Sequence, residues 1–146
     1  MKKFFSLFVA MFVLVAVGYA QKGAIKFDKE THDFGKIEQG KPATYVFKFK
    51  NMGKEPIFIS DAAASCGCTK PSWTKEAVMP GQTGSVSATY NAAAGGGFNK
   101  SVTVTSNAET PSVTLYLKGE VVSKEALETA GATAPKTAND KKKGTK

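Results

Sequence analysis

The chain has 146 residues and a formal net charge of +8, and all 20 of its basic residues are lysine. Its length suits one domain of ordinary size. Arginine is the residue best suited to bidentate contacts with phosphates and guanine edges, so its absence argues against nucleic-acid recognition. We expect a solvated lysine surface with some affinity for anionic components of a cell envelope.

The N-terminal segment has the pattern of an export signal. Lys2 and Lys3 precede an apolar run from Phe4 to Val17, and small residues follow at Gly18 and Ala20. The run has about 14 residues, whereas a membrane-spanning helix needs roughly 20. We therefore predict a signal peptide over residues 1–20 and an exported protein, periplasmic or extracellular, that is not an integral membrane protein after cleavage. An uncleaved membrane anchor is the alternative.

The segment from residue 24 to 121 alternates apolar and polar side chains with a period of two, which is typical of strands with one buried face. Turn residues divide it into about seven short strands, near residues 24–27, 33–37, 43–51, 56–63, 84–91, 98–106 and 112–121. This pattern predicts an all-β fold, a single immunoglobulin-like antiparallel β-sandwich over residues 21–121. We expect Trp73 over a sheet end and six phenylalanines in the core: Phe27, Phe34, Phe47, Phe49, Phe58 and Phe98.

The composition changes again near residue 122. Lysine, alanine and threonine dominate, and no large apolar residue follows Leu127. Such a segment buries too little surface to offset its ordering entropy. We predict a disordered tail over residues 122–146, in which residues 122–128 can form one or two helical turns.

The order of the motifs resembles a bacterial family called Domain of Unknown Function 1573, over about residues 25–121. The resemblance depends on His32-Asp33-Phe34-Gly35, a strand ending in Asn51-Met52-Gly53, Ser65-Cys66-Gly67-Cys68-Thr69, a Pro80-Gly81 turn, and Leu117-Lys118-Gly119-Glu120-Val121. It implies export, a non-enzymatic scaffold, and a fold similar to PapD-type and cilia-associated β-sandwiches. The turn at residues 91–97 departs from the charged, proline-containing turn that is commoner in this family.

Cys66 and Cys68 are the only cysteines in the chain. In an extended strand their Cα atoms would lie about 6.5–7 Å apart, at the edge of the range for a disulfide. Gly67 permits the backbone to tighten, so we expect that a bridge can close with strain. Closing so short a loop would stabilise the fold little, and the bridge would be easily reduced.

Three other interpretations of the pair stay open. Two thiolates at this spacing can bind a soft metal such as Cu(I), with His32, Met52 or Met79 as weaker candidate ligands. We expect His32 to be a turn or surface residue, however, and the two methionines to fill gaps in the core. A redox partner is a further interpretation, although the helix that supports a Cys-x-x-Cys site is missing. The last is a pair of half-buried residues that shape a loop.

The sequence favours an exported, non-catalytic, immunoglobulin-like binding or scaffolding module of the bacterial cell envelope. Its partner would be an envelope protein held by an edge strand or loop. We predict no catalytic residues and no cofactor. The alternative is a periplasmic protein that handles a soft metal (copper) or thiol redox chemistry at Cys66 and Cys68. A PapD-like chaperone is less favoured, because it would need a second domain.

Overall fold

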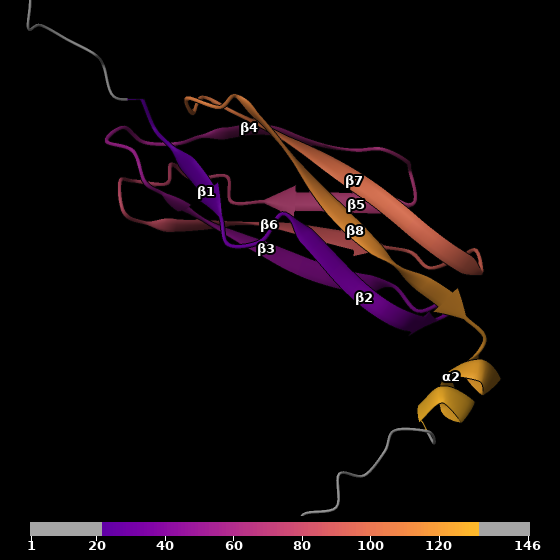
Figure 1. Cartoon of the computed structure of the whole chain (residues 1–146). Coiled ribbons are helices and arrows are strands. Elements are labelled where there is room, and N and C mark those ends of the chain that lie inside the picture. The colour runs from indigo at the N-terminus through magenta and orange to yellow at the C-terminus, as the bar shows by residue number, and fades with distance from the viewer. Residues whose placement is uncertain (1–21, 132–146) are drawn as a thin grey trace, which may run out of the picture.

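The computed structural model describes residues 22–131 (Figure 1). The predicted signal peptide and residues 132–146 of the predicted tail lie outside this range. The described chain forms β1 (Ile25–Phe27), β2 (Thr31–Glu38), β3 (Ala43–Asn51), β4 (Ile59–Ala64), β5 (Thr69–Trp73), β6 (Thr83–Tyr90), β7 (Gly96–Ser106), β8 (Ser112–Val122) and α2 (Lys124–Gly131). Within residues 22–131, no helix has the length and apolar character needed to cross a membrane.

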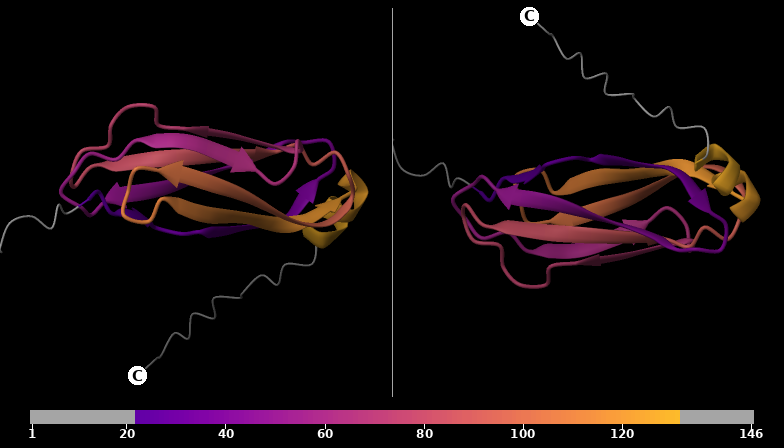
Figure 2. Two further views of the ribbon diagram at one scale, coloured as in Figure 1. Left: turned by 90° about the horizontal axis from the view of Figure 1, so that it is seen from above. Right: turned by 90° about the horizontal axis from the view of Figure 1, so that it is seen from below.

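The eight strands form two sheets of four strands each. Their orders are β1-β3-β6-β5 and β2-β8-β7-β4. Figure 2 shows the sheets from above and below as two layers packed face to face. Every neighbouring pair is antiparallel except β2 with β8, which is parallel. The predicted all-β, immunoglobulin-like sandwich is confirmed, and β1, β5, β2 and β4 are its edge strands.

One of the eight strands, β5, was not predicted. It carries Pro71, and a proline within an apolar-polar run argues against a strand in the interior of a sheet. In the structure β5 is an edge strand, where Pro71 pairs with Ala88 and the missing N–H is tolerated on the unpaired side.

The parallel pairing of β2 with β8 was also not expected, because the residue pattern of a strand carries no information about its direction.

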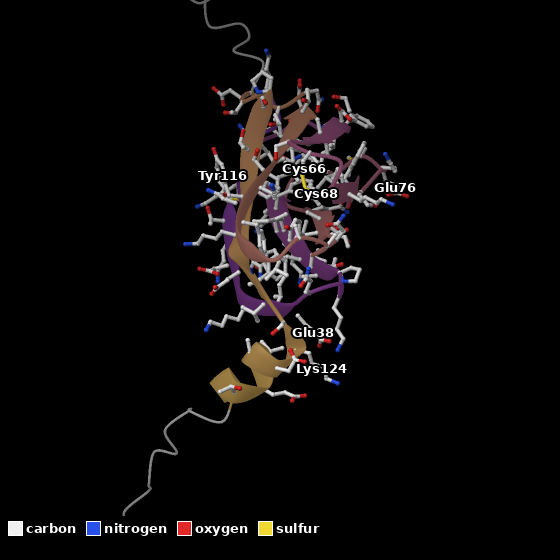
Figure 3. The ribbon with its side chains drawn as sticks, turned by 90° about the vertical axis from the view of Figure 1, so that its right-hand side faces the viewer. Glu38, Cys66, Cys68, Glu76, Tyr116 and Lys124 are labelled. Carbon is white, nitrogen blue, oxygen red and sulfur yellow. A yellow bond between two sulfur atoms is a disulfide. The ribbon has the colours of Figure 1, made fainter. Side chains whose placement is uncertain are left out.

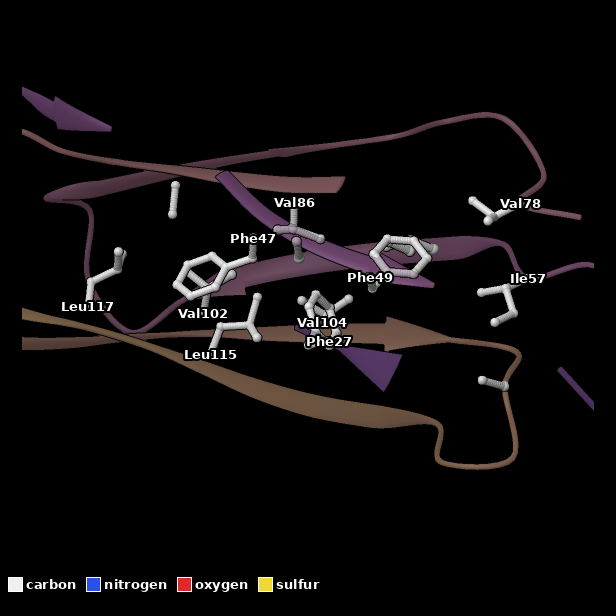
Figure 4. Close-up of a cluster of buried hydrophobic side chains, with 14 residues drawn as sticks. Phe27, Phe47, Phe49, Ile57, Val78, Val86, Val102, Val104, Leu115 and Leu117 are labelled. Carbon is white, nitrogen blue, oxygen red and sulfur yellow. The ribbon is translucent and has the colours of Figure 1, made fainter. Parts of the chain in front are cut away.

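The core lies between the sheets and consists of the inward-facing residues of their strands (Figure 4). On β3, Phe47 and Phe49 are fully buried, while Lys48 and Lys50 between and beyond them are exposed. On the facing sheet, Leu115 and Leu117 are fully buried as well. Each such side chain contributes roughly 1.5–3 kcal/mol when it leaves water, so this layer holds the two sheets together.

The six phenylalanines expected in the core divide into three groups. Phe27, Phe47, Phe49 and Phe98 are buried, and Phe34 is half-buried against the core. Phe58 is 51% exposed, so its predicted core position is wrong. Ile57, Phe58 and Ile59 are three apolar residues in succession, and a bridge between Ile57 and Val78 turns Ile57 inward. The alternation of faces then places Phe58 on the outside.

A second, smaller cluster closes the end of the sandwich next to α2. Tyr90 and Phe98 stack with ring centroids 4.1 Å apart, and Ala92 and Val121 complete the buried set. Residue 122 belongs to β8, so the predicted start of the tail is too early, and α2 (Lys124–Gly131) forms the one or two helical turns that the sequence allowed here. The Oγ of Ser123 accepts a hydrogen bond from the Ala126 N–H at 3.3 Å, which caps the first turn of this helix.

Asn51, at the end of β3, is a buried polar residue that joins three segments. Its Nδ2 donates to the carbonyls of Glu55 and Val78, at 2.8 and 2.9 Å. Its Oδ1 accepts from the Gly53 N–H at 2.9 Å. The side chain is completely buried, so water cannot replace these partners. Asn51 therefore fixes the turn after β3 against the segment that precedes β6.

We predict that Asn51→Ala lowers the free energy of unfolding by about 2–4 kcal/mol, because it removes three hydrogen bonds and leaves the Glu55 carbonyl and the Gly53 N–H without a partner, while the Val78 carbonyl keeps the Ile57 N–H. Urea denaturation measures the loss. The matched control is Asn107→Ala, because Asn107 makes two similar bonds, to Pro56 and Phe58, from an exposed position where water can substitute. Equal losses in the two variants would contradict the argument from burial.

Candidate functional site

Cys66 and Cys68 lie in the turn between β4 and β5 and are joined by a disulfide (Figure 3). Their Cα atoms are 5.3 Å apart, within the usual range for such a bridge. The Thr69 N–H donates to the Cys66 carbonyl at 3.3 Å, so the segment is a turn and not an extended strand. Because the segment is a turn, the two Cα atoms lie closer together than the roughly 6.5–7 Å expected for residues i and i+2 of an extended strand.

The cysteine turn, residues 65–69, is held by both sheets. The backbone N–H of Ser65 donates to the Ser101 carbonyl of β7 at 2.9 Å, and the Ser101 N–H donates back to the Ser65 Oγ at 3.1 Å. On the other side, the Asn91 N–H donates to the Cys68 carbonyl at 3.0 Å. Cys68 packs against the second cluster, while Cys66 and Cys68 both stay partly exposed. The disulfide is thus fixed in position and open to solvent.

Gly67 is less constrained than the sequence suggested. Its φ is not positive, and a Cβ at this position would meet no atom within 4 Å. The backbone of the turn therefore closes without needing the freedom of glycine, and we expect an alanine here to be accommodated.

The structure does not gather the other candidate soft ligands around the cysteine pair. His32 is on β2, at the opposite edge of its sheet from β4. Met52 and Met79 lie in turns near the start of β6, whereas Thr69 pairs with Tyr90 at the end of β6. Both methionines are about half exposed, so the expectation that they fill gaps in the core is wrong. Among residues 22–131, no three His, Cys, Asp or Glu side chains are grouped to hold a metal.

His32 is a half-buried strand residue rather than a turn residue. Its ring stacks on Tyr45 with centroids 3.6 Å apart and meets the Phe34 ring edge-on at 4.5 Å. Burial lowers the pKa of His32, Lys29 lowers it further, and Asp33 opposes the change. The neutral ring is therefore favoured in the fold, and its packing contact with β3 explains its position.

Trp73 stands at the other end of β5 from the cysteine turn, so it does not flank the disulfide. Its indole N–H donates to the Ile59 carbonyl at 3.2 Å, which ties β5 to β4 across the sandwich. The Lys75 Nζ lies 3.3 Å above the ring centroid, a cation–π contact. Both contacts fit the predicted packing role over a sheet end.

The feature that the sequence did not show is the open edge at β4. Of the four edge strands, β1 has only three residues, β2 has a bulge between Asp33 and Lys36, and β5 contains Pro71. Short length, bulges and prolines all protect edges against added strands. In β4 the pairing with β7 has a bulge of the same kind between Ile59 and Asp61, but residues 61–64 follow in regular register and contain no proline. The exposed Phe58 precedes this strand directly.

The two packed sheets define an immunoglobulin-like, PapD-like β-sandwich. The chain is similar to a protein of unknown function from Porphyromonas gingivalis W83, with a TM-score of 0.63 and 15% identity over 73% of this chain and 50% of that chain. It thus spans half the length of that protein. It also resembles PapD-like domain 7 of human CEP192, with a TM-score of 0.59 and 10% identity over 74% of this chain and 92% of that domain.

A third similar structure is the VesB protease of Vibrio cholerae, with a TM-score of 0.57 and 13% identity over 66% of this chain and 32% of that protein. Identities this low show a common fold alone. Residues 25–121 match the profile of a family described as a protein of unknown function, DUF1573, and the chain belongs to that family. Curated protein sequences gave no significant match. The predicted family is therefore confirmed.

We predict that Cys66→Ala/Cys68→Ala lowers the free energy of unfolding by no more than about 2 kcal/mol, because the loop that the bridge closes is so short. Thermal or urea denaturation of the variant and of the wild type, with and without reductant, measures the effect. A loss above about 3 kcal/mol, or a reduced wild type that fails to fold, would show that the bridge is a structural staple.

Proposed function

We propose that the protein is an exported, non-catalytic binding module of the cell envelope, which accepts an extended segment of a partner protein at the β4 edge. The observation that carries this proposal is the exposed Phe58 directly before an edge strand whose segment after the bulge, residues 61–64, is regularly paired and contains no proline, whereas β1 has only three residues and β5 contains Pro71. The disulfide supports export, because such bridges persist mainly in oxidising compartments.

The β4 edge offers what strand addition requires. An added strand gains main-chain hydrogen bonds along the edge, and its specificity comes from pockets and exposed side chains nearby. Ala63 is exposed and small, so it allows a second backbone to approach closely. Phe58 supplies an exposed aromatic ring at the start of the edge, the kind of residue that often dominates binding energy. The cysteine turn ends the edge after six residues, about 20 Å.

The test is a pull-down from envelope extract with Phe58→Ser/Ala63→Lys, which removes the aromatic anchor and places a charge on the edge. We expect partner recovery to fall at least about tenfold relative to wild type. The matched control is Tyr116→Ser/Ser112→Lys, which makes the same kinds of change at exposed positions of β8, a strand paired on both sides. Equal recovery with both variants would rule out the β4 edge as the binding site.

The second candidate function is thiol exchange at the cysteine turn, favoured by the solvent-accessible disulfide. In this reaction an external dithiol transfers two electrons and two protons to the bridge. Cys66 and Cys68 become free thiols, and the dithiol becomes a disulfide. The reduced pair would then offer two sulfur ligands to Cu(I), a metal that accepts low coordination.

We predict that a dithiol of thioredoxin-like potential reduces this bridge in the folded protein within minutes. Mass spectrometry of the alkylated product measures the two thiols, and Cys66→Ala/Cys68→Ala provides the unreactive control. A Cu(I) titration of the reduced protein, scored against the same variant, separates metal binding from thiol exchange. A bridge that resists the dithiol until the protein unfolds would remove this candidate.

A further inference from the structure

We propose that the outer face of the β1-β3-β6-β5 sheet binds a linear acidic polysaccharide. The four strands of this sheet contain no acidic residue, and their charged residues are Lys26, Lys48, Lys50 and Lys70, all exposed. We call this surface the lysine face. The strands of the other sheet balance their charges: they carry Lys36, Lys100 and Lys118 together with Asp33, Glu38, Asp61 and Glu120.

Strand pairing brings lysines together that are distant in the sequence. Lys26 of β1 lies directly opposite Lys50 of β3, and Lys50 lies opposite Thr83 of β6. At the far end of β6, Thr89 lies opposite Lys70 of β5. The rows at Thr83 and Thr89 are six residues apart, so the lysine face extends about 20 Å along the strands.

The positive charge of this face is not neutralised within the described part of the protein. The two ion pairs found there join Lys41 to Glu38 and Lys118 to Asp33 at 3.4 Å, and neither involves the lysine face. Like charges directly opposite each other, as Lys26 and Lys50 are, destabilise a pair of strands. Asp28, after β1, is the carboxylate at the border, and it forms no ion pair with these lysines among residues 22–131. An anionic ligand would remove this repulsion.

Hydroxyl groups fill the space between the lysines. Ser72 lies opposite Ser87, and within residues 22–131 neither hydroxyl has a hydrogen-bond partner. In the next row, Thr44 and Thr89 share a hydrogen bond of 2.8 Å. Such rows can donate to and accept from the hydroxyls and ring oxygens of sugars, while the lysines contact carboxylates.

This combination fits a polysaccharide better than two other polyanions. Single-stranded nucleic acids need aromatic side chains for base stacking, and among the outward-facing strand residues of this sheet there is none. Membrane surfaces are held by apolar insertion together with charge, and Val46 is the only large apolar side chain here with much exposure, at 45%. A flat surface of lysines and hydroxyls instead suits a flexible chain that carries a carboxylate on each sugar.

The test measures binding of polygalacturonate to the protein purified from cells expressing the full chain, at about 50 and about 200 mM salt. Lys26→Gln/Lys48→Gln/Lys50→Gln/Lys70→Gln should lower the affinity at least about tenfold and flatten its salt dependence. The control is Lys22→Gln/Lys36→Gln/Lys54→Gln/Lys124→Gln, which removes the same charge from exposed lysines outside the face. Its affinity should change less than about threefold.

Two results would overturn the proposal. One is an equal loss in both variants, which would mean that net charge alone drives binding. The other is binding to vesicles of phosphatidylcholine and phosphatidylglycerol, but not to polygalacturonate, which would identify a membrane surface. Ser72→Ala/Ser87→Ala separates sugar recognition from charge: it should weaken polygalacturonate about threefold and leave polyphosphate binding unchanged. No change with either polymer would refute a polysaccharide ligand.

One substitution at Lys26 distinguishes a role in ligand binding from a role in the stability of the fold, because the two roles predict different changes in melting temperature and affinity. Lys26→Glu places opposite charges across β1 and β3, so it should raise the melting temperature by about 1–5 °C. The same change should weaken polygalacturonate binding. A fall in both stability and affinity would show that Lys26 acts on the fold rather than on a ligand.

Discussion

The whole structure depends on one constraint, the alternation of side chains along strands that must cover one another. Phe47 and Phe49 reach the core only because Lys48 and Lys50 point outward, and a slip of one residue in the pairing would exchange the two sets. The facing sheet meets them with Leu115 and Leu117 under the same rule. Asn51 then ends β3 with three hydrogen bonds that hold the adjoining turns in place. The register of the two sheets follows from this packing.

The same constraint produces the two surfaces on which our proposals depend. Apolar residues turned inward leave the outward positions of one sheet to lysines and hydroxyls, and closing the sandwich leaves β4 as an open edge of the other sheet. The lysine face presents side chains, which suits a charged polymer. The β4 edge presents backbone groups, which suits an added strand. Because the two surfaces belong to different sheets, one molecule can use both.

The cysteine turn stands where the chain passes from one sheet to the other, between β4 and β5. Hydrogen bonds from Ser65, Ser101 and Asn91 already hold this crossing, so the disulfide adds a constraint to a segment that is largely fixed. A bridge over one residue closes too small a loop to be a main source of stability. Because both cysteines are partly exposed, the bridge is accessible to an external thiol, as the proposed thiol exchange requires.

The sequence by itself determined the strands that alternate regularly, the sandwich class and the family, because a period of two and a set of ordered motifs are local properties. It also located the two cysteines, but not the turn that brings their Cα atoms to 5.3 Å. Only the tertiary structure decided that Pro71 lies in an edge strand, that Phe58 faces solvent, and that β4 is an edge strand next to Phe58. The pairing of β1, β3, β6 and β5 in the tertiary structure places Lys26, Lys50 and Lys70 on one face of the sheet. Each of these depends on which strands become neighbours, and that is set by burial summed over the whole domain rather than by any local pattern.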